Sequence, residues 1–442
     1  HCSRRGICRV NSSMQISLDY GKQGLMVTLP DYLDVRTLAY KTATPLAQQP
    51  NMTDRQALQA VLDKPNNTPP LNEIIQGRSS VCIVICDITR PVPNQLMLEP
   101  ILETLHAGGI ETQNIKILIA TGLHRPSRPE EIVEMVGAEI AEKYNVINHD
   151  AQDPHQLVYL GKSPRGVSMW INTHYMEADM KITVGLIEPH FMAGFSGGRK
   201  LVCPGIAGIE TIRAWHSPRF LEHPNAATGQ LDGNPVHSEN TWIASRAGCN
   251  FIVNVVIDAY RRPLKFVAGD QISAFEEGAA FCQDIVIDRV DQEYDIVITS
   301  SAGYPLDTTF YQSVKGMMAA VPIVKQGGSI IVAASMTEGI GSDEFASLFK
   351  RHPNIDDFMQ AIMSPDYFVM DQWQLEMMAK VLRKAEVKVV TDGLSQETIK
   401  QLFVDSAESV ETAVDEALRV HGQNASIAVI PRGPYVIPEV VS

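Results

Sequence analysis

The sequence predicts an α/β protein with two α/β lobes, mostly parallel sheets and an active-site cleft between the lobes. Apolar runs of strand length alternate with amphipathic runs of helix length, a pattern typical of βαβ units on a sheet covered on both faces. This alternation occurs in two separate series along the chain. The length of 442 residues suits two or three domains with ample core, and two lobes favour a cleft.

The first series of elements begins near residue 79. The segment 251–286 later in the chain predicts a hairpin and a helix that close this domain. In parallel sheets ligands bind beyond the carboxyl ends of the strands, so residues with a chemical role are expected there. The series alternates strand, helix, strand, helix and strand over segments 80–88, 94–109, 114–122, 128–144 and 145–149.

The second series begins near residue 294 and defines a second domain. We predict an N-terminal α/β domain over residues 14–286 and a C-terminal α/β domain over residues 287–424. Residues 425–442 indicate a strand and a Pro-rich return, which we expect to pack back on the first domain. Residues 1–13 lack the apolar core of a signal peptide and are interpreted as a leader or an expression remnant. The second series covers segments 294–303, 308–324, 327–335, 372–385 and 386–393.

The composition excludes several classes of protein. With 45% hydrophobic and 20% charged residues, the chain is not disordered, collagen-like or a coiled coil. No apolar run reaches the roughly 18 residues of a membrane helix, so we expect no membrane association. The 51 acidic and 37 basic residues give a formal net charge of −14, and no Lys/Arg cluster favours nucleic acid. A small anionic substrate would need a locally basic cleft.

The seven cysteines form no CxxC pair. Four of the five that lie beyond the first ten residues have apolar or small neighbours, which indicates reduced thiols in a cytoplasmic protein. Cys82 and Cys86 are interpreted as small side chains in one buried strand, and metal ligation is the alternative.

Polar side chains follow two of the predicted strands. Asp87 and Arg90 come directly after the apolar run 81–86. They are either an acid and a base at a site, or a capping aspartate and a surface arginine. His124 follows the run 115–119, where a loop histidine is either a base or an ordinary polar residue.

The Gly-rich stretch 188–200 holds the densest set of candidate residues. Gly197 and Gly198 allow the backbone to approach a ligand closely, and N–H groups at a helix start suit an anion such as phosphate. Arg199 and Lys200 add positive charge, and a deprotonated lysine is also a nucleophile. The stretch has neither P-loop spacing nor the GxGxxG fingerprint of nicotinamide cofactors. The alternative is a Gly-rich turn with solvated basic residues.

Two further stretches complete the set of motifs. His216 ends a predicted helix 16 residues after Lys200, where it is either a metal ligand or a histidine at a helix C-terminus. Residues 311–316 open a helix in the second lobe, and their polar side chains face either the cleft or solvent.

Taken together, these motifs resemble the nickel-dependent lactate racemase family, whose members use a nickel-pincer nucleotide. The order of the motifs is preserved, with 10 residues from His190 to Lys200 and 16 from Lys200 to His216. The resemblance covers nearly all of the chain after Met14. The matching stretches are DITRP at 87–91, TGLH at 121–124, EPHFMAGFSGGRK at 188–200, HS at 216–217, YQSVK at 311–315 and DQWQ at 371–374.

The resemblance implies nickel and a covalently bound cofactor, pyridinium-3-thioamide-5-thiocarboxylic acid mononucleotide. The tether in this sequence would be Lys200, and the one protein ligand of nickel would be His216. The resemblance also implies that cofactor-synthesis proteins are partners. The other cofactor contacts would come from Asp87, Gly197, Gly198, Arg199 and Trp373.

The resemblance further implies a racemase or epimerase of lactate or a related small 2-hydroxy acid, which acts by hydride removal and return through a 2-keto acid. The two enantiomers present their hydroxyl groups from different directions, so each needs its own acid-base group; these would be His124 and His190. The anionic substrate would be bound by Arg90, Lys315, Gln312 and Tyr311.

Two other functions are alternatives. One is a non-catalytic nickel or nucleotide carrier of the same fold, which would need only Lys200 and His216. The other is a 2-hydroxy acid dehydrogenase, which would release its keto acid. The presence of both His124 and His190 argues against the carrier, and the missing dinucleotide fingerprint argues against the dehydrogenase.

Overall fold

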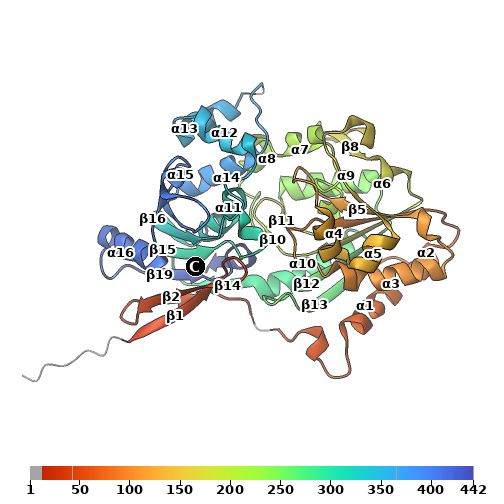
Figure 1. The fold of residues 1–442 in the computed structure, drawn as a ribbon, viewed down its shortest axis with the longest axis horizontal. Coiled ribbons are helices and arrows are strands. Elements are labelled where there is room, and N and C mark those ends of the chain that lie inside the picture. The colour runs from red at the N-terminus through yellow and green to blue at the C-terminus, as the bar shows by residue number, and fades with distance from the viewer. Residues whose placement is uncertain (1–11, 42, 365, 442) are drawn as a thin grey trace, which may run out of the picture. The chain divides into compact units, whose positions relative to one another are not determined.

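The computed structural model describes residues 12–41, 43–364 and 366–441. They divide into two compact units, one of residues 40–287 and one that joins residues 12–39 to residues 288–441 (Figure 1). Each unit contains one six-stranded sheet in which most neighbours are parallel. The predicted α/β class with mostly parallel sheets is therefore confirmed, and the cleft stays a prediction.

The sheet of unit 40–287 has the strand order β13-β12-β9-β4-β5-β6. All neighbours are parallel except β12 and β13, which form the predicted hairpin. The central strands are almost continuously apolar because both faces of the sheet are covered. The strands are β4 (Val81–Cys86), β5 (Ile115–Ala120), β6 (Asn145–Asn148), β9 (Met180–Leu186), β12 (Phe251–Ile257) and β13 (Pro263–Gly269).

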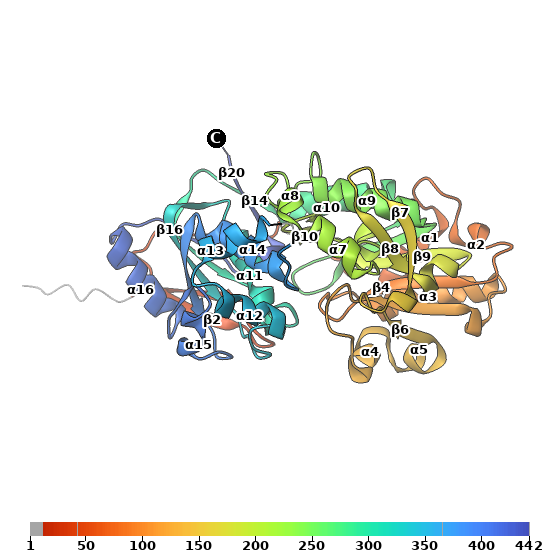
Figure 2. The ribbon, with the colours of Figure 1, turned by 90° about the horizontal axis from the view of Figure 1, so that it is seen from above.

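Helices cover both faces of this sheet (Figures 1 and 2). On one face, Leu98 and Ile101 of α3 (Asn94–Ala107) share a buried core with Ile83 of β4. On the other face, α10 (Ser273–Val286) packs along β12 and β13. The remaining helices are α1 (Asp54–Asp63), α2 (Leu71–Ile74), α4 (Pro129–Val136), α5 (Ala138–Lys143), α6 (Thr173–Glu177), α7 (Ile209–Trp215), α8 (Pro218–Leu221) and α9 (Pro235–Ala247). Two hairpins add β7 (Leu157–Lys162) with β8 (Ser168–Asn172), and β10 (Pro189–His190) with β11 (Gly194–Phe195).

The sheet of the second unit has the order β18-β17-β16-β15-β19-β3, with parallel pairs throughout. Val410, Val414 and Leu418 lie on one side of α16 and share a core with Ile298 of β15. The strands are β3 (Val35–Thr37), β15 (Tyr294–Ser300), β16 (Val324–Ala333), β17 (Ala385–Val390), β18 (Asp405–Ser406) and β19 (Ile427–Ile430). The helices are α11 (Phe310–Ala320), α12 (Asp343–Arg351), α13 (Ile355–Ile362), α14 (Gln372–Leu382), α15 (Gln396–Lys400) and α16 (Val410–His421).

The structure differs from the predicted domains at both ends of the chain. Residues 14–39 belong to the unit of the C-terminal sheet, because β3 pairs with β19 and the hairpin of β1 (Ser13–Leu18) and β2 (Leu25–Pro30) adds to its core. Residues 425–441 do not return to the first domain. Instead, β19 pairs with β15, and β20 (Ile437–Val440) pairs with β14 (Ile287–Val290). The physical reason is that β19 fills a place between β15 and β3, where its backbone is hydrogen-bonded on both sides.

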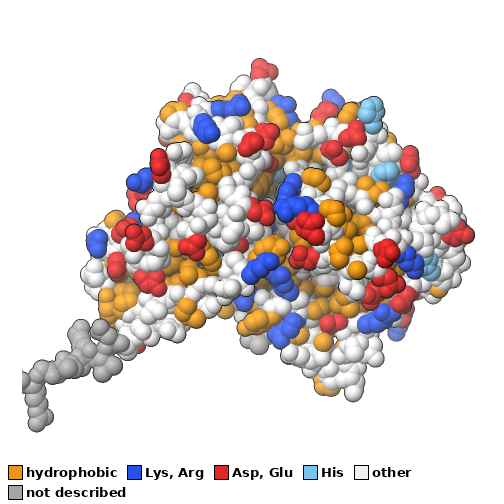
Figure 3. All heavy atoms as spheres, viewed as in Figure 1, with side chains coloured by type: hydrophobic (Ala, Val, Ile, Leu, Met, Phe, Trp, Pro, Cys, Tyr) orange, Lys and Arg blue, Asp and Glu red, His pale blue; other side chains and the backbone are white. Residues whose placement is uncertain are grey.

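Several predictions concern the surface and the thiols. Cys82 and Cys86 lie in β4, as the buried-strand interpretation predicts. The five cysteines of the described part are all free thiols, whereas Cys2, Cys8 and most of the predicted leader 1–13 lie outside it. Within the described residues no helix is long and apolar enough to cross a membrane. Acidic and basic side chains are interspersed on the face drawn in Figure 3.

Candidate active site

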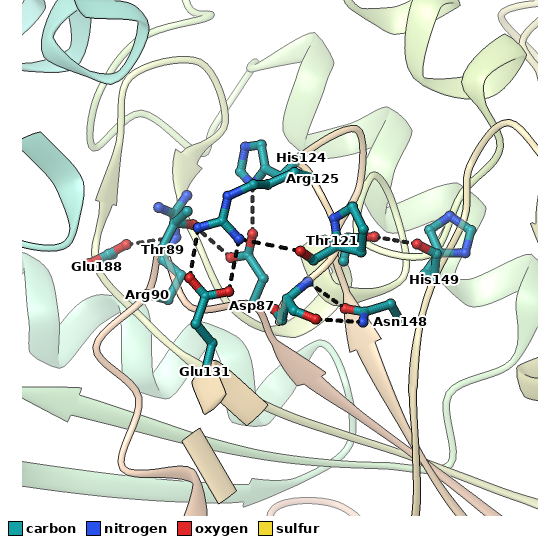
Figure 4. A network of polar contacts seen from close by, with 12 residues as sticks. Asp87, Thr89, Arg90, Thr121, His124, Arg125, Glu131, Asn148, His149 and Glu188 are labelled. Carbon is teal, nitrogen blue, oxygen red and sulfur yellow. Dashed lines mark hydrogen bonds and ion pairs between the residues drawn. The ribbon is translucent and has the colours of Figure 1, made fainter. Parts of the chain in front are cut away.

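Three neighbouring parallel strands of unit 40–287 end at the same edge of its sheet. β4 lies between β5 and β9, so the turns after these three strands emerge side by side. The turns carry Asp87, His124 and His190, and Figure 4 shows the polar network around the first two. Residues that are far apart in sequence therefore meet where a parallel sheet places its ligand sites.

Asp87 holds His124 from the turn after β4. Its Oδ2 accepts a hydrogen bond from His124 Nδ1 at 2.7 Å, and its Oδ1 accepts one from Thr89 Oγ1 at 2.6 Å. Burial raises the pKa of Asp87, but the interactions with His124, Thr89 and Arg90 outweigh burial, and the pKa is lowered overall. Ionised Asp87 fixes the proton of neutral His124 at Nδ1, so Nε2 is the nitrogen that can accept a proton.

The loop that carries His124 is anchored beyond this contact. Arg125 donates two hydrogen bonds to Glu131, at 2.8 and 2.7 Å (Figure 4). Asn148 at the end of β6 exchanges two hydrogen bonds with the backbone of Ser127, at 2.8 and 3.0 Å. Because the loop is held by these contacts as well as by Asp87, His124 is ordered before any ligand binds.

Arg90 is at the centre of a charged group. Its Nε lies 3.0 Å from Glu188 Oε1, and the two side chains are only 15% and 10% exposed. Its positive charge also lowers the pKa of both Asp87 and Lys200, so all three lie within electrostatic reach. No role was predicted for Glu188 from the sequence. The available signal was that Glu188 is the only acid in the stretch 188–200.

His190 lies in the β10–β11 hairpin and is held differently from His124. Its Nδ1 accepts hydrogen bonds from the backbone N–H groups of Met192 and Ala193, both at 3.2 Å. A nitrogen that accepts carries no proton, so neutral His190 carries its proton at Nε2. The two histidines thus differ: His124 has its lone pair at Nε2, and His190 has its N–H there.

The side chains of Lys200 and His216 both lie near the ring of Trp215. The ring of Trp215 stacks on His216 at 3.5 Å between centroids, and Lys200 Nζ lies 5.7 Å from the Trp215 ring. Burial, together with the positive charges of Arg199 and Arg90, lowers the pKa of Lys200 to about 7. A substantial fraction of this amine is therefore neutral, and nucleophilic, near neutral pH.

The hydrogen bond of His216 leaves the lone pair of its neutral ring at Nε2. Its Nδ1 is 2.9 Å from the carbonyl oxygen of Ile212, which requires the proton at Nδ1. Burial lowers the pKa of His216 well below its usual value, and the positive charge of Lys200 acts in the same direction. A neutral imidazole oriented by a backbone carbonyl is the form that binds metals. Across the described residues, no group of three or more His, Cys, Asp or Glu side chains could hold a metal ion.

The glycines beside Lys200 serve close packing of the protein. A Cβ on Gly197 would lie 2.8 Å from Ile187, and one on Gly198 would lie 3.0 Å from Phe275. Both residues have positive φ, at 85° and 49°, which favours glycine. The N–H of Gly198 donates to Asn254 Oδ1 at 2.8 Å. These contacts explain the glycines without a ligand, and their predicted cofactor contacts stay predictions.

Arg199 is also engaged with its own loop. Its Nη2 donates to the carbonyl oxygen of Ala193 at 2.9 Å, and its guanidinium lies 4.1 Å from the ring centre of Phe275. Burial lowers its pKa to about 9. Arg199 therefore ties the end of the Gly-rich stretch to the β10–β11 hairpin, and a contact with the nucleotide remains a prediction.

In the second unit, α11 and α14 bring together another predicted group. Trp373 Nε1 donates to the Tyr311 hydroxyl at 3.0 Å, and Gln374 Nε2 donates to the Tyr311 carbonyl at 2.5 Å. Burial raises the pKa of Tyr311 well above its usual value, and the charge of Asp371 raises it further. Tyr311 is thus held by Trp373 and Asp371 of the DQWQ stretch, which limits what its hydroxyl can offer a substrate.

Gln312 and Lys315 lie on the same helix as Tyr311 and are 6% and 8% exposed. Gln312 Oε1 has no hydrogen-bond partner among the described residues. The structure therefore assembles the predicted residues in two groups, one in each unit. The group in unit 40–287 contains Asp87, Arg90, His124, His190, Gly197, Gly198, Arg199, Lys200 and His216, and the second contains Tyr311, Gln312, Lys315 and Trp373.

Comparison with known proteins covers both units. The family model of the lactate racemase N-terminal domain matches residues 20–229, and that of the C-terminal domain matches residues 290–438. The lactate racemase of Thermoanaerobacterium thermosaccharolyticum is 36% identical over 424 residues, which are 96% of this chain and 98% of that protein. The lactate racemase of Lactiplantibacillus plantarum is 35% identical over 429 residues, 96% of this chain and 99% of that protein.

Solved structures show the same relationship. The lactate racemase apoprotein of T. thermosaccharolyticum superposes with a TM-score of 0.87 at 34% identity, over 96% of this chain and all of that one. A protein from Thermotoga maritima shares the fold, with a TM-score of 0.70 at 16% identity over 91% of this chain and all of that one. The chain therefore belongs to the lactate racemase family, whose members are isomerases.

Proposed function

We propose that this protein interconverts the enantiomers of lactate, or of a closely related small 2-hydroxy acid, through a 2-keto acid. The observation that carries the proposal is the position of Arg90, which lies within electrostatic reach of both the Asp87–His124 pair and Lys200. A carboxylate-binding charge, an acid-base group and a reactive amine are thereby gathered at one sheet edge. The 35–36% identity with two lactate racemases supports lactate as the substrate.

The residues of unit 40–287 fit a covalently attached nickel-pincer nucleotide. Lys200 has an amine with a pKa of about 7, suited to bond formation, and His216 has its neutral lone pair at Nε2. Trp215 lies beside both side chains, so the amine and the imidazole are near a single indole. The chemistry that such a group supplies when bound is reversible acceptance of a hydride from C2 of the substrate.

His124 and His190 provide the proton chemistry in this proposal. Oxidation at C2 requires that the hydroxyl proton leave as the hydride leaves, and His124 Nε2 is the unprotonated nitrogen for that step. Return of the hydride to the opposite face requires a proton for the oxygen in its new direction. In this proposal His190 gives that proton from Nε2 as an imidazolium and is reprotonated from solvent, while His124 releases to solvent the proton that it accepted. Proton and hydride both return to the substrate, so no external oxidant is consumed.

Arg90 binds the substrate carboxylate in this proposal. Glu188 holds Arg90 at Nε, which fixes the plane of the guanidinium before the substrate arrives. A carboxylate fixed by arginine lets the keto acid turn about its C1–C2 bond, which exchanges the directions of the oxygen and the methyl group. That turn accounts for the need for two histidines. The proposal places this activity in the cytoplasm and requires cofactor-synthesis proteins as partners.

The test uses protein produced together with cofactor-synthesis proteins. Intact mass should show an adduct on the wild-type chain, and L-lactate should become racemic. In heavy water the C2 hydrogen should remain protium through inversion, because a transferred hydride does not exchange with solvent. Deuterium that enters C2 in step with inversion would refute hydride transfer. Stoichiometric release of keto acid without racemisation would identify a dehydrogenase, and an adduct with no turnover would identify a carrier.

A further inference from the structure

His149 lies at the end of β6 and is 3% exposed. Its Nε2 is 2.9 Å from the carbonyl oxygen of Ala207, and its Nδ1 is 3.0 Å from the side-chain nitrogen of Asn172. A carbonyl oxygen only accepts, so Nε2 carries the proton, and Nδ1 then accepts from the Asn172 amide. Both ring nitrogens are therefore satisfied in one tautomer of a neutral ring.

Ala207 belongs to the segment that connects Lys200 with His216. This segment runs along the ends of the strands and is held by their backbones as well as by His149. Asn172 N–H donates to the Ile206 carbonyl at 3.0 Å, and Gly122 N–H donates to the Gly205 carbonyl at 2.9 Å. Of these three contacts, only the one from His149 is made by a side chain.

The other end of His149 is tied to the loop of His124. The His149 N–H donates to the Ile119 carbonyl at 3.1 Å, and the His149 carbonyl accepts from Thr121 Oγ1 at 2.7 Å (Figure 4). Thr121 is three residues before His124, and its carbonyl accepts from the His124 N–H at 2.8 Å. One residue thus contacts both the Lys200–His216 segment and the turn that carries His124.

We infer that His149 is a positioning residue, which sets the Lys200–His216 segment relative to the His124 turn through its hydrogen bond to Ala207. The inference rests on the proposed function for the roles of Lys200, His216 and His124. Burial lowers the pKa of His149 to about 4, so the ring stays neutral and the contact persists across the neutral pH range. The sequence around His149 matches none of the motifs that indicate a site, so no role was predicted for it.

The test compares three variants. His149→Leu removes both hydrogen bonds, whereas His149→Gln keeps an N–H that can reach the Ala207 carbonyl. His106→Leu is the matched control. His106 has the same kind of contacts, with Nδ1 2.9 Å from the Ile110 carbonyl and Nε2 2.7 Å from the Tyr144 hydroxyl, but its partners belong to neither segment.

The first measurement is hydrogen–deuterium exchange of unloaded protein. Peptides that cover residues 203–209 should exchange about tenfold faster in His149→Leu, and near wild-type rates in His149→Gln and His106→Leu. The second is nickel retention of loaded protein against a chelator. Loss of a residue that orients a metal site typically lowers metal affinity about 10- to 100-fold. The rate of nickel loss, measured on protein with equal adduct content, should therefore be at least about tenfold higher in His149→Leu. Thermal unfolding midpoints for all variants identify general destabilisation.

The outcomes are separable. Unchanged exchange at residues 203–209 in His149→Leu would overturn the inference, as would nickel loss no faster than in His106→Leu. If His149→Leu does not fold, His149→Gln is compared with His149→Asn, which is too short to reach Ala207; equal exchange in these two would also overturn it. If wild-type protein carries no adduct or nickel, the proposed function fails, and the exchange data still decide whether His149 holds the segment.

Discussion

Replacing Asp87 with asparagine tests the central contact of the candidate site. The change removes the negative charge 2.7 Å from His124 Nδ1 and keeps the size of the side chain. An asparagine can turn its NH₂ group toward Nδ1, which would place the histidine proton on Nε2 and remove the lone pair that accepts the substrate proton. The fold should persist because Thr89 can still bond to the amide.

The expected magnitude follows from the strength and exposure of the contact. A hydrogen bond to a charged group contributes about 1.5–3 kcal/mol, which corresponds to a rate change of roughly 10- to 150-fold. The Asp87 side chain is 6% exposed but that of His124 is 35% exposed, so solvent screens part of the interaction. We therefore expect kcat/KM to fall by about 10- to 50-fold.

The assay is racemisation of each lactate enantiomer by adduct-loaded protein, with intact mass confirming equal loading. Because the enantiomers have equal free energy, kcat/KM must fall by the same factor in both directions, which provides an internal check. Glu131→Gln is the control. It neutralises a carboxylate in α4, the helix that follows the same loop, which pairs with Arg125 and makes no hydrogen bond or ion pair with His124, so we expect less than about a threefold effect. Equal activities of the two variants would refute the role assigned to Asp87.

The same variant also predicts how folding stability depends on pH. A carboxyl group whose pKa is lower in the folded state contributes stability above its unfolded pKa, here near 3.8, and loses that contribution as the pH falls through the folded value. The stability difference between wild type and Asp87→Asn should therefore be constant from pH 7 to about 5 and shrink below it. A difference that grows on acidification would contradict the lowered pKa.

Three further substitutions test separate parts of the site. Lys200→Ala should keep the fold and lose the covalent mass increment, and an unchanged increment would place the tether elsewhere. His216→Ala should retain the adduct but lose nickel, measured by elemental analysis, because it removes the imidazole oriented by Ile212. Glu188→Gln should raise KM for lactate by roughly tenfold with a smaller change in kcat, since it frees the Arg90 guanidinium; a fall in kcat alone would show that Glu188 acts on the chemical step instead.

Asp87 and His124 were recognisable as candidates in the sequence because each follows an apolar strand. They come at the ends of β4 and β5, and the carboxyl ends of parallel strands meet by geometry. Their partners were not recognisable in this way. Asp87 pairs with His124, and Glu188 pairs with Arg90. Both pairings depend on side-chain directions that only the packing of the folded chain determines.

The glycines of the stretch 188–200 illustrate the same limit. The number of glycines indicates that the backbone closely approaches another group. It does not indicate whether that group belongs to a ligand or to the protein. The structure shows Phe275 and Asn254 in that place, from segments more than 50 residues later in the chain. His149 also follows a strand, but that position did not indicate its role, because the role depends on the Ala207 carbonyl, which tertiary folding brings to it.

The sequence by itself determined the α/β class, the two series of strands and helices, and the family, since periodicity and motif spacing are local properties. Only the tertiary structure decided that residues 14–39 and 425–441 complete the C-terminal sheet. A strand of three or four residues such as β3 or β19 carries too little pattern to name its neighbour. Its place is decided by which sheet edge can satisfy its backbone hydrogen bonds and bury its apolar side chains.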